Sequence, residues 1–348
     1  MEVKDRIQYY DTLKLIGIIC IISLHIFQLW RGGEQILHFD FYALAEFVRM
    51  GVPIFLMISG ALLLGRDIEI RDFYERKLVR ICLPFIFFLI LHLIIIRPDS
   101  FNVFAYNWYF WMILGVYFSI PIINKFVLHS SFEEIRYILI LIVATSIIYQ
   151  LFYYFGIETF LNLNFFMGPF SYLILGYYFS RREFRISTNR IITIALAVFF
   201  GVTLLKMWGV LNIIPHDLVI NFNVNQTELV NSWLDGGILE LIQASSIFIL
   251  VKYLYKSETS IYSRFKNVLE TKVIKSFIIS VSKASYGMYL VNRTLMSLCK
   301  NQVSSMHLTG TQMAICFIVL VGAIFFSSWI IVLIFSRIPV IKRFSGYA

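Results

Sequence analysis

The sequence predicts an all-α integral membrane protein, a polytopic bundle of about ten transmembrane helices, from its composition and the lengths of its apolar runs. Of its 348 residues, 59% are hydrophobic and 15% are charged, and the mean hydropathy is +0.77. This composition lies far from that of soluble globular domains. The apolar runs are roughly 18 to 25 residues long, enough to cross about 30 Å of hydrocarbon as helices. Runs such as FIFFLILHLIII are apolar on every face, which argues against the alternating strands of a membrane barrel.

Ten predicted spans follow one another along the chain. We expect them near residues 12–30, 41–65, 79–97, 106–124, 137–155, 166–180, 191–209, 236–252, 276–299 and 311–336. The fourth span carries Trp108, Tyr109 and Trp111 near its start, as suits the bilayer interface, and the sixth span is short. Because the spans take up nearly the whole chain, residues 1–348 are expected to form one transmembrane domain without an appended soluble domain.

Lysine and arginine are distributed unevenly over the loops between these spans. Loops on the side of the N-terminus carry 22 of them, and the other side carries 3, Arg31, Arg97 and Lys300. Because basic loops stay in the cytoplasm, both termini are expected there, in a bacterial-type plasma membrane. The first apolar run is long and lacks a small-residue cleavage site, so we interpret it as a retained helix. The net charge of +9 is then mostly a topology signal, and a nucleic-acid partner is not expected.

The sequence also lacks the usual signs of a bound metal or cofactor. Its four cysteines lie in or at the edges of spans and have neither metal-ligand spacing nor a disulfide framework. Walker, Rossmann and HExxH patterns are absent as well. An ATP-driven machine on this chain alone is therefore not expected.

Five cations fall inside the predicted spans rather than in loops. They are Lys14, Arg49, Lys206, Lys283 and Arg293. Ionisable groups at such depth usually face a cavity or a partner and mark a functional site. For Lys206 and Lys283 a second interpretation stays open, in which the side chains reach out to a nearby interface.

The first span, DTLKLIGIICIISLHIF, carries Lys14 and, eleven positions later, His25. At about 100° per residue these two residues fall on nearly the same helix face, roughly 16 Å apart along the axis. They predict a polar stripe from the cytoplasmic side into the outer half of the bilayer. A histidine in a span can also act as a hydrogen-bonding link between helices, and that interpretation stays open.

The second span contains Glu46 and Arg49, three positions apart and so able to pair on one helix face. Pro53, Ser59 and Gly60 follow, which suits a bent helix packed closely against its neighbours. A purely structural ion pair between Glu46 and Arg49 remains an alternative to a functional role.

Four stretches of the chain form a joint pattern. They are YYDTLKLIGIICIISLHIF, RMGVPIFLMISGALLLGR, DFYERKLVRICLP, and the combination of WYFWMILGVYFSIPII with SYGMYLVN. In order and spacing they resemble the membrane acyltransferase-3 family, which includes O-acetyltransferases of bacterial surface polysaccharides. The matching family patterns are an aspartate and basic residue followed by a histidine, VPLFFxxSG, RRLxRIxP, a tryptophan-rich helix and SxGIYLxH. The resemblance extends over nearly the whole chain.

The resemblance implies a membrane-bound enzyme that moves an acyl group, commonly acetyl, from cytoplasmic acyl-CoA to a hydroxyl of a glycan or lipid-linked sugar. The expected partners are thus acyl-CoA, that acceptor and membrane lipid. His25 matches the family's catalytic histidine and can act as general base; a covalent acyl-histidine is the less favoured variant. Lys14 stands where the family usually has arginine, which keeps the charge but loses the bidentate fork.

Other site candidates follow from the same resemblance. Arg76, Lys77 and Arg80 align with the basic motif and can bind the phosphates of CoA, although a plain positive-inside anchor explains them too. Arg49 can balance charge on the thioester oxygen. The remaining candidates are Glu46, Ser59, Trp108 of the tryptophan-rich helix, Tyr106 at a position where relatives often carry histidine, and Asn292 in place of the YLxH histidine.

Two other functions stay open at this stage. Buried charges in a ten-helix bundle also fit a transporter or flippase for a lipid-linked sugar or exopolysaccharide. A scaffolding protein is a more distant alternative, because it needs no buried charges. The basic residue and histidine of the first span, followed by RKLVR, favour the acyltransferase, since a pure transporter has no need of them.

Overall fold

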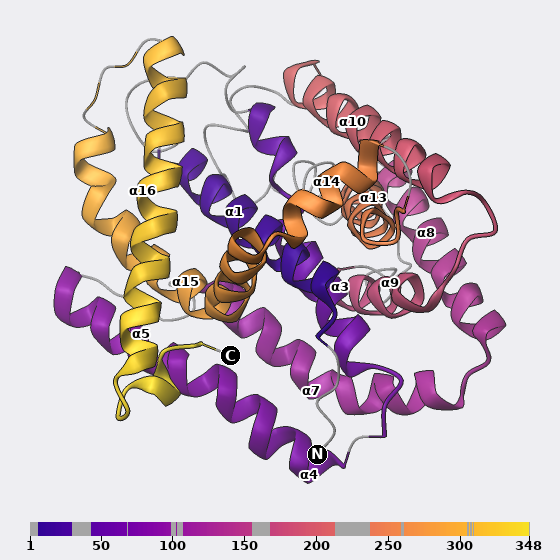
Figure 1. Ribbon diagram of the computed structural model, residues 1–348, viewed down its shortest axis with the longest axis horizontal. Helices are drawn as coiled ribbons and strands as arrows, with labels where there is room; N and C mark the ends of the chain where they lie inside the picture. Colours follow the sequence, from indigo (N-terminus) through magenta and orange to yellow (C-terminus); the bar gives the residue numbers. More distant parts are fainter. Residues whose placement is uncertain are drawn as a thin grey trace. The chain divides into compact units, whose positions relative to one another are not determined.

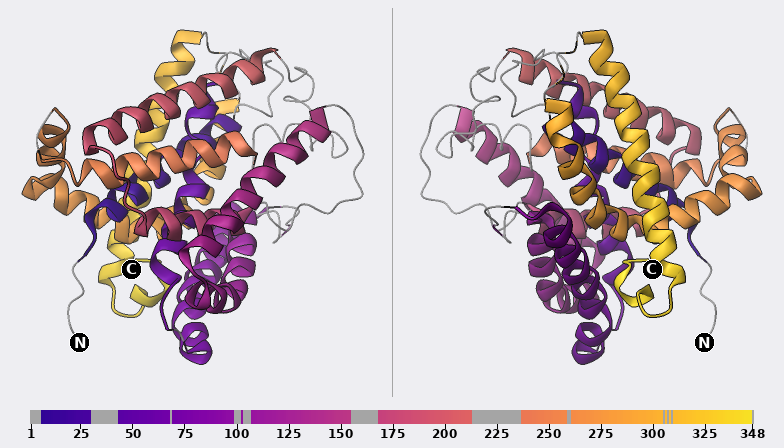
Figure 2. Two further views of the ribbon diagram at one scale, coloured as in Figure 1. Left: turned by 90° about the vertical axis from the view of Figure 1, so that its right-hand side faces the viewer. Right: turned by 90° about the vertical axis from the view of Figure 1, so that its left-hand side faces the viewer.

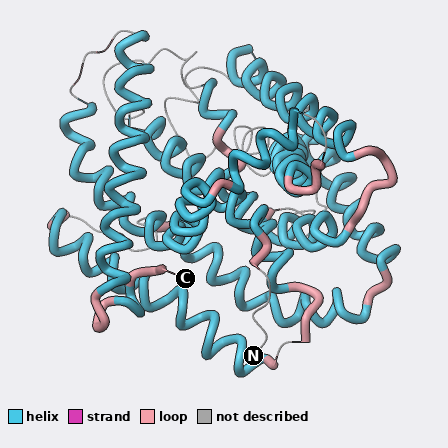
Figure 3. Tube along the Cα trace, viewed as in Figure 1, coloured by secondary structure: helices cyan, strands magenta, loops and turns pink. Residues whose placement is uncertain are grey.

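The fold is that of a computed structural model, which describes residues 6–29, 43–67, 69–98, 102, 107–154, 168–212, 237–258, 261–304, 306, 308 and 310–347. Within these ranges every regular element is a helix, as Figure 3 shows. The predicted all-α class is therefore confirmed.

Each predicted span contains a helix. In chain order the elements are α1 (Gln8–Leu29), η2 (Leu44–Phe47), α3 (Gly51–Leu63), α4 (Ile70–Phe73), η3 (Tyr74–Leu78), α5 (Val79–Ile96), α7 (Trp108–His129), α8 (Phe132–Tyr154), α9 (Pro169–Arg181), α10 (Thr188–Asn212), α13 (Ile238–Leu254), α14 (Ile261–Glu270), α15 (Lys272–Ser304), α16 (Gly310–Arg337) and η6 (Lys342–Phe344). Figure 1 labels most of them along the chain. The short helix α14 lies in a region that was predicted as a loop.

Among the described residues, 7 helical segments are long and apolar enough to cross a membrane. They are Gln8–Phe27, Leu44–Leu63, Ile70–Ile96, Trp108–His129, Phe132–Phe152, Thr188–Asn212 and Gly310–Arg337. The protein is thus a multi-pass membrane protein. Helices α9 and α13 have only 13 and 17 residues, and α15 carries several lysines and an arginine. As spans, these three stay predictions, and so does the orientation of the termini.

The second span differs from the prediction of one bent helix. It consists of the 3-10 turn η2 and the α-helix α3, separated by a turn at residues 48–50. Pro53 is the third residue of α3, where its missing N–H costs no helical hydrogen bond. The break places Glu46 in η2 and Arg49 in the turn, so the two do not share a helix face, and their pairing stays a prediction.

The chain divides into two compact units, which we describe one at a time. Unit 1 comprises Met1–Gly17, Arg49–Leu62 and Ile135–Ser282. In this unit α10 and α13 run side by side, as both views of Figure 2 show. A Cβ atom on Gly60 of α3 would lie 1.9 Å from the carbonyl oxygen of Leu173 of α9. The backbones of these two helices therefore touch, as expected of Gly60 from the sequence.

Unit 2 comprises Ile18–Val48, Leu63–Glu134 and Lys283–Ala348. Helix α5 is joined to α4 through the π-turn η3, and η6 packs back against α5 and α16. The rings of Phe85 on α5 and Phe110 on α7 stack with centroids 3.6 Å apart. Near the other end of α7, Nδ2 of Asn124 donates to the carbonyl oxygen of Arg66 at 2.6 Å. These contacts hold α5 and α7 in place beside the residues of the site below.

Candidate active site

His25 lies near the C-terminal end of α1 and is only 9% exposed. Its Nδ1 atom is 3.3 Å from Oδ1 of Asn292, a fully buried residue of α15. Since an amide oxygen only accepts hydrogen bonds, Nδ1 carries the hydrogen in this pair. The Nε2 atom then keeps its lone pair, the form in which an imidazole takes up a proton. The structure thus brings together two candidates from the sequence, His25 and Asn292.

A second pair of polar residues continues from this contact. Tyr289 precedes Asn292 by three positions on α15, and its ring centroid lies 6.2 Å from that of His25. The Tyr289 hydroxyl donates to Oδ1 of Asn107, a residue that is 2% exposed at the N-terminal end of α7. The ring of Tyr109 packs against Tyr289 with centroids 4.8 Å apart. All of these residues belong to unit 2.

Helix α15 also contacts a second histidine. Nδ1 of His92 on α5 is 3.2 Å from Oγ1 of Thr294, and both side chains are buried. Between Asn292 and Thr294 stands Arg293, whose charge acts on both imidazoles. Two of three consecutive residues of α15 therefore contact a histidine each, and the residue between them carries a charge that acts on both. The sequence analysis singled out Arg293 but missed His92, although a histidine inside the apolar run FIFFLILHLIII was a visible signal.

The predicted CoA-binding residues lie around the start of α5. Arg76 pairs with Asp72 at 3.0 Å, one helical turn earlier, and both side chains are largely exposed. Lys77 is half-buried within the π-turn η3, and Arg80 is exposed on the first turn of α5. Three cations thus lie within five positions of one another with little burial. This arrangement suits a phosphate ligand and a membrane anchor equally.

The other predicted site residues come from several elements of the chain. Lys14 shares the unbroken helix α1 with His25, as expected, but belongs with Arg49 and Ser59 to unit 1. Ser59 Oγ donates to the carbonyl oxygen of Phe55 at 2.9 Å, which is a helix-internal bond. The remaining candidates are Glu46, fully buried in η2, Trp108, 56% exposed at the start of α7, and Tyr106, outside the described residues.

Unit 1 contains a buried polar network of its own. The side chains of Thr203, Lys206 and Gln243 are fully buried between α10 and α13. Lys206 Nζ donates to Oε1 of Gln243 at 3.2 Å, and Nε2 of Gln243 donates to Oγ1 of Thr203 at 2.7 Å. Because Lys206 is fully buried inside the protein, the interpretation that it reaches the membrane interface is wrong. Lys283 is half-buried, and both interpretations of it stay open.

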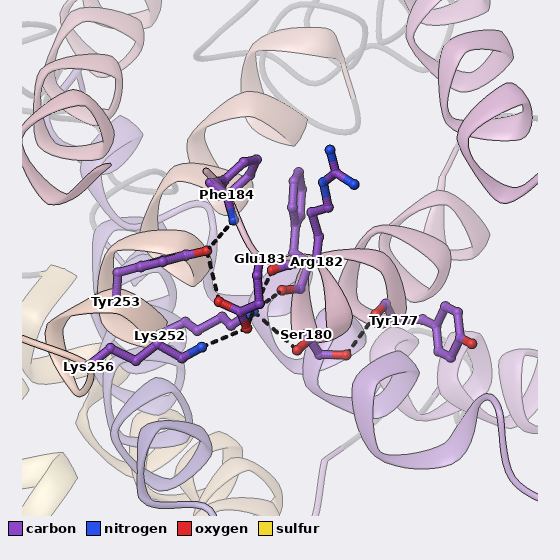
Figure 4. Close-up of polar contacts among 9 residues, drawn as sticks. Tyr177, Ser180, Arg182, Glu183, Phe184, Lys252, Tyr253 and Lys256 are labelled. Carbon is purple, nitrogen blue, oxygen red and sulfur yellow. Dashed lines mark hydrogen bonds and ion pairs between the residues drawn. The ribbon is translucent and has the colours of Figure 1, made fainter. Parts of the chain in front are cut away.

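A second cluster of polar and charged residues in unit 1 lies at the C-terminal end of α9 (Figure 4). Lys252 Nζ donates to the carbonyl oxygens of Phe179, Ser180 and Arg182 at 2.9, 3.2 and 2.7 Å. Helix ends leave such carbonyls without helical partners, so the lysine acts as a structural cap. Glu183 pairs with Lys252 at 3.0 Å and with Lys256 at 2.6 Å. Partial burial opposes ionisation, but the two ammonium groups lower the pKa of the Glu183 carboxyl to about 2.

An apolar cavity of about 730 Å³ also lies in unit 1, between α8, α9, α10 and α13. Its walls are mostly aliphatic and aromatic, and the predicted site residues are absent from its lining. Such a lining suits hydrocarbon rather than the phosphates of CoA or the hydroxyls of a sugar. We therefore place the candidate active site at His25 and not at this cavity.

The structure defines a class of protein: a multi-pass, all-α membrane protein with a buried histidine held in the form of a base. The comparison with known families is more specific. A family model described as an acyltransferase domain matches residues 7–334. The chain belongs to this family, acyltransferase-3, and is a membrane acyltransferase, as the four stretches predicted. No curated protein and no solved structure matched the chain.

Proposed function

We propose that this acyltransferase moves an acyl group, most simply acetyl, from cytoplasmic acyl-CoA to a hydroxyl of a cell-surface polysaccharide or lipid-linked sugar. The observation that carries the proposal is the contact between Nδ1 of His25 and Oδ1 of Asn292. It leaves Nε2 as a proton acceptor inside the protein, and an acyltransferase needs such a base to activate a hydroxyl.

In the proposed reaction, Nε2 of His25 takes the proton of the acceptor hydroxyl while that oxygen attacks the thioester carbonyl. The new C–O bond forms and the carbonyl electrons move onto oxygen. When the tetrahedral intermediate collapses, the C–S bond breaks, and the thiolate of CoA takes the proton from His25. Base catalysis of this kind contributes a factor of about 10² to 10⁴ in rate.

The donor is proposed to enter from the cytoplasm, the side on which the distribution of basic loops predicts both termini of a plasma-membrane protein. Arg76, Lys77 and Arg80 would bind its phosphates, and their exposure leaves them accessible to a charged ligand. Lys14, near the start of α1, would attract the donor toward the span that carries His25. The scheme uses no metal or bound cofactor, and acyl-CoA is the donor substrate.

The test uses membranes that contain the protein, radiolabelled acetyl-CoA and extracted surface glycan. We expect base-labile label on the glycan, and we expect His25→Gln to reduce it by about 10² to 10⁴. His129→Gln is the matched control, because His129 is exposed at the end of α7 and lies outside the site. Robust transfer by the folded His25→Gln protein would remove His25 from the role of base.

Transport of a lipid-linked sugar is the alternative function. The observation that favours it is Lys206, a fully buried cation on a spanning helix, in a network separate from the proposed catalytic residues. Protein in sealed vesicles distinguishes the two functions. Movement of labelled sugar across the vesicle without acylation would favour transport, whereas acylation that requires His25 favours the enzyme.

A further inference from the structure

Two buried amide groups, one in contact with His25 and the other with Tyr289, have unused hydrogen-bond donors. Asn107 and Asn292 are 2% and 0% exposed. Each uses its Oδ1 atom as an acceptor, Asn107 from the Tyr289 hydroxyl and Asn292 from Nδ1 of His25. The Nδ2 atom of each has no partner in the part of the chain that the structure describes. Buried donors are nearly always paired in proteins, so two exceptions near one histidine call for an explanation.

The two amides belong to one group of contacts. Tyr289 and Asn292 stand three positions apart on α15 and therefore on the same helix face. One of these residues binds Asn107 and the other binds His25, while the His25 and Tyr289 rings lie 6.2 Å apart. Because both oxygen atoms are already engaged, each amide is held in one orientation. The NH₂ groups are thus fixed donors, that of Asn292 on the residue in contact with the proposed base and that of Asn107 one residue further along the same chain of contacts.

We propose that Nδ2 of Asn292, together with Nδ2 of Asn107, binds the oxyanion that forms on the thioester carbonyl during acyl transfer. This inference rests on the proposed function and assigns a second catalytic group to it. As the acceptor oxygen attacks, negative charge develops on the former carbonyl oxygen, and donors already in position stabilise it. Neutral amides suit this task because they donate hydrogen bonds without competing for the proton that His25 removes.

In this proposal the two polar side-chain atoms of Asn292 have different roles. Oδ1 fixes the imidazole so that Nε2 faces the acceptor hydroxyl as a base, and Nδ2 binds the oxyanion. The second role is the one that the sequence assigned to Arg49. Asn292 and His25 both lie in unit 2, whereas Arg49 belongs to unit 1. The proposal assigns this role to the amides on contacts that the structure shows within unit 2.

The test replaces one atom of the site. Asn292→Asp keeps an oxygen acceptor for His25 and nearly the same shape, but it removes the N–H donors. We expect kcat for transfer to fall on the order of 100-fold to 1,000-fold, with a much smaller change in KM for acetyl-CoA, because the donor binds the charged oxyanion more strongly than the neutral carbonyl oxygen. The control is Asn212→Asp, since Asn212 is exposed on α10 and donates to the carbonyl oxygen of Trp208. This control should transfer at the wild-type rate.

A second readout does not depend on transfer. Infrared spectra of carbonyl-¹³C acetyl-CoA bound to the purified protein report hydrogen bonds to the thioester oxygen. We expect the carbonyl frequency to fall on binding to the wild type and to fall by less in Asn292→Asp, which keeps only the Asn107 donor. Should that variant fail to fold, as judged by gel filtration in the same detergent, Asn107→Asp changes the second donor and carries the same comparison.

The outcomes separate this inference from the proposed function. A frequency change that Asn292→Asp reduces, without acylation of any glycan, supports the oxyanion site and contradicts the proposed acceptor. Normal transfer by Asn292→Asp, with a bound carbonyl frequency equal to that in the wild type, would overturn the oxyanion site and leave the proposed function intact. So would a wild-type protein that acylates glycan without any change in the carbonyl frequency on binding.

Discussion

The two buried polar networks differ in whether their hydrogen bonds are complete. In unit 1, Gln243 uses both ends of its amide, accepting from Lys206 and donating to Thr203, whose hydroxyl in turn donates to the carbonyl oxygen of Phe199. In unit 2, Asn107 and Asn292 each use only the oxygen, and their nitrogens lack partners among the described residues. A complete network holds helices together, whereas an incomplete one has donors left for a substrate. The first is therefore interpreted as structural and the second as catalytic.

Outside the site, the largest expected effect is a loss of stability on substitution of Gln243. Gln243→Leu removes the acceptor of Lys206 and the donor to Thr203 while keeping a similar volume. We expect the free energy of unfolding to fall by about 1–3 kcal/mol, because buried polar groups lose a hydrogen-bond partner. Transfer per folded molecule should be unchanged. Thermal unfolding and acetyl transfer are measured in the same detergent.

The matched control is Gln312→Leu, since Gln312 is exposed on α16 and the change should leave unfolding nearly as it was. A loss of transfer in folded Gln243→Leu protein of normal stability would contradict the comparison. It would mean that the network of unit 1 takes part in the reaction.

A smaller effect is expected at His92, and it sharpens the contrast within unit 2. Both histidines contact α15, but His25 meets an amide oxygen, which only accepts, whereas His92 meets the Thr294 hydroxyl. A hydroxyl both donates and accepts, so it does not fix the imidazole as a base. We expect His92→Gln to reduce transfer by less than about tenfold, against about 10² to 10⁴ for His25→Gln. Parallel transfer assays check this; equal losses would make the two histidines joint catalysts.

The helices were predictable from the sequence because long apolar runs leave few alternatives in a membrane. The break at residues 48–50 was not, because Pro53 three residues further on predicted a bend in one helix, whereas the helix ends at Phe47 and starts again at Gly51. Lys206 shows a second limit. Its distance from the helix end allowed a side chain directed to the interface, and only the position of Gln243 on another helix decides that it is buried.

The site was predictable in part for the same reason. His25 follows from one span and from the family pattern, which are both local in the sequence. Asn107 was missed because its role depends on Tyr289, 182 positions further along the chain. Asn292 was noticed only as a departure from the family motif. Its contact with His25 depends on a residue of α1, 267 positions away in the sequence.

The smallest expected effect concerns the cap of α9 in unit 1. There the prediction tests the contribution of ion pairs to stability. The pKa of the Glu183 carboxyl, about 2, lies below its ordinary value of about 4.3 because of Lys252 and Lys256. A lowered pKa in the folded state means that the ion pair stabilises the protein above about pH 4.3. That contribution is lost as the pH falls toward 2.

The Glu183 side chain is 56% exposed, so solvent and salt weaken its ion pairs, and we expect them to contribute less than about 1 kcal/mol. Unfolding temperatures of the wild type and Glu183→Gln should therefore differ slightly at pH 6 and converge only near pH 2, because protonation of the folded protein then removes the same charge that the substitution removes. High salt at pH 6 should shrink the difference as well. A difference that persists unchanged near pH 2 would show that the charge of Glu183 contributes little to this cap.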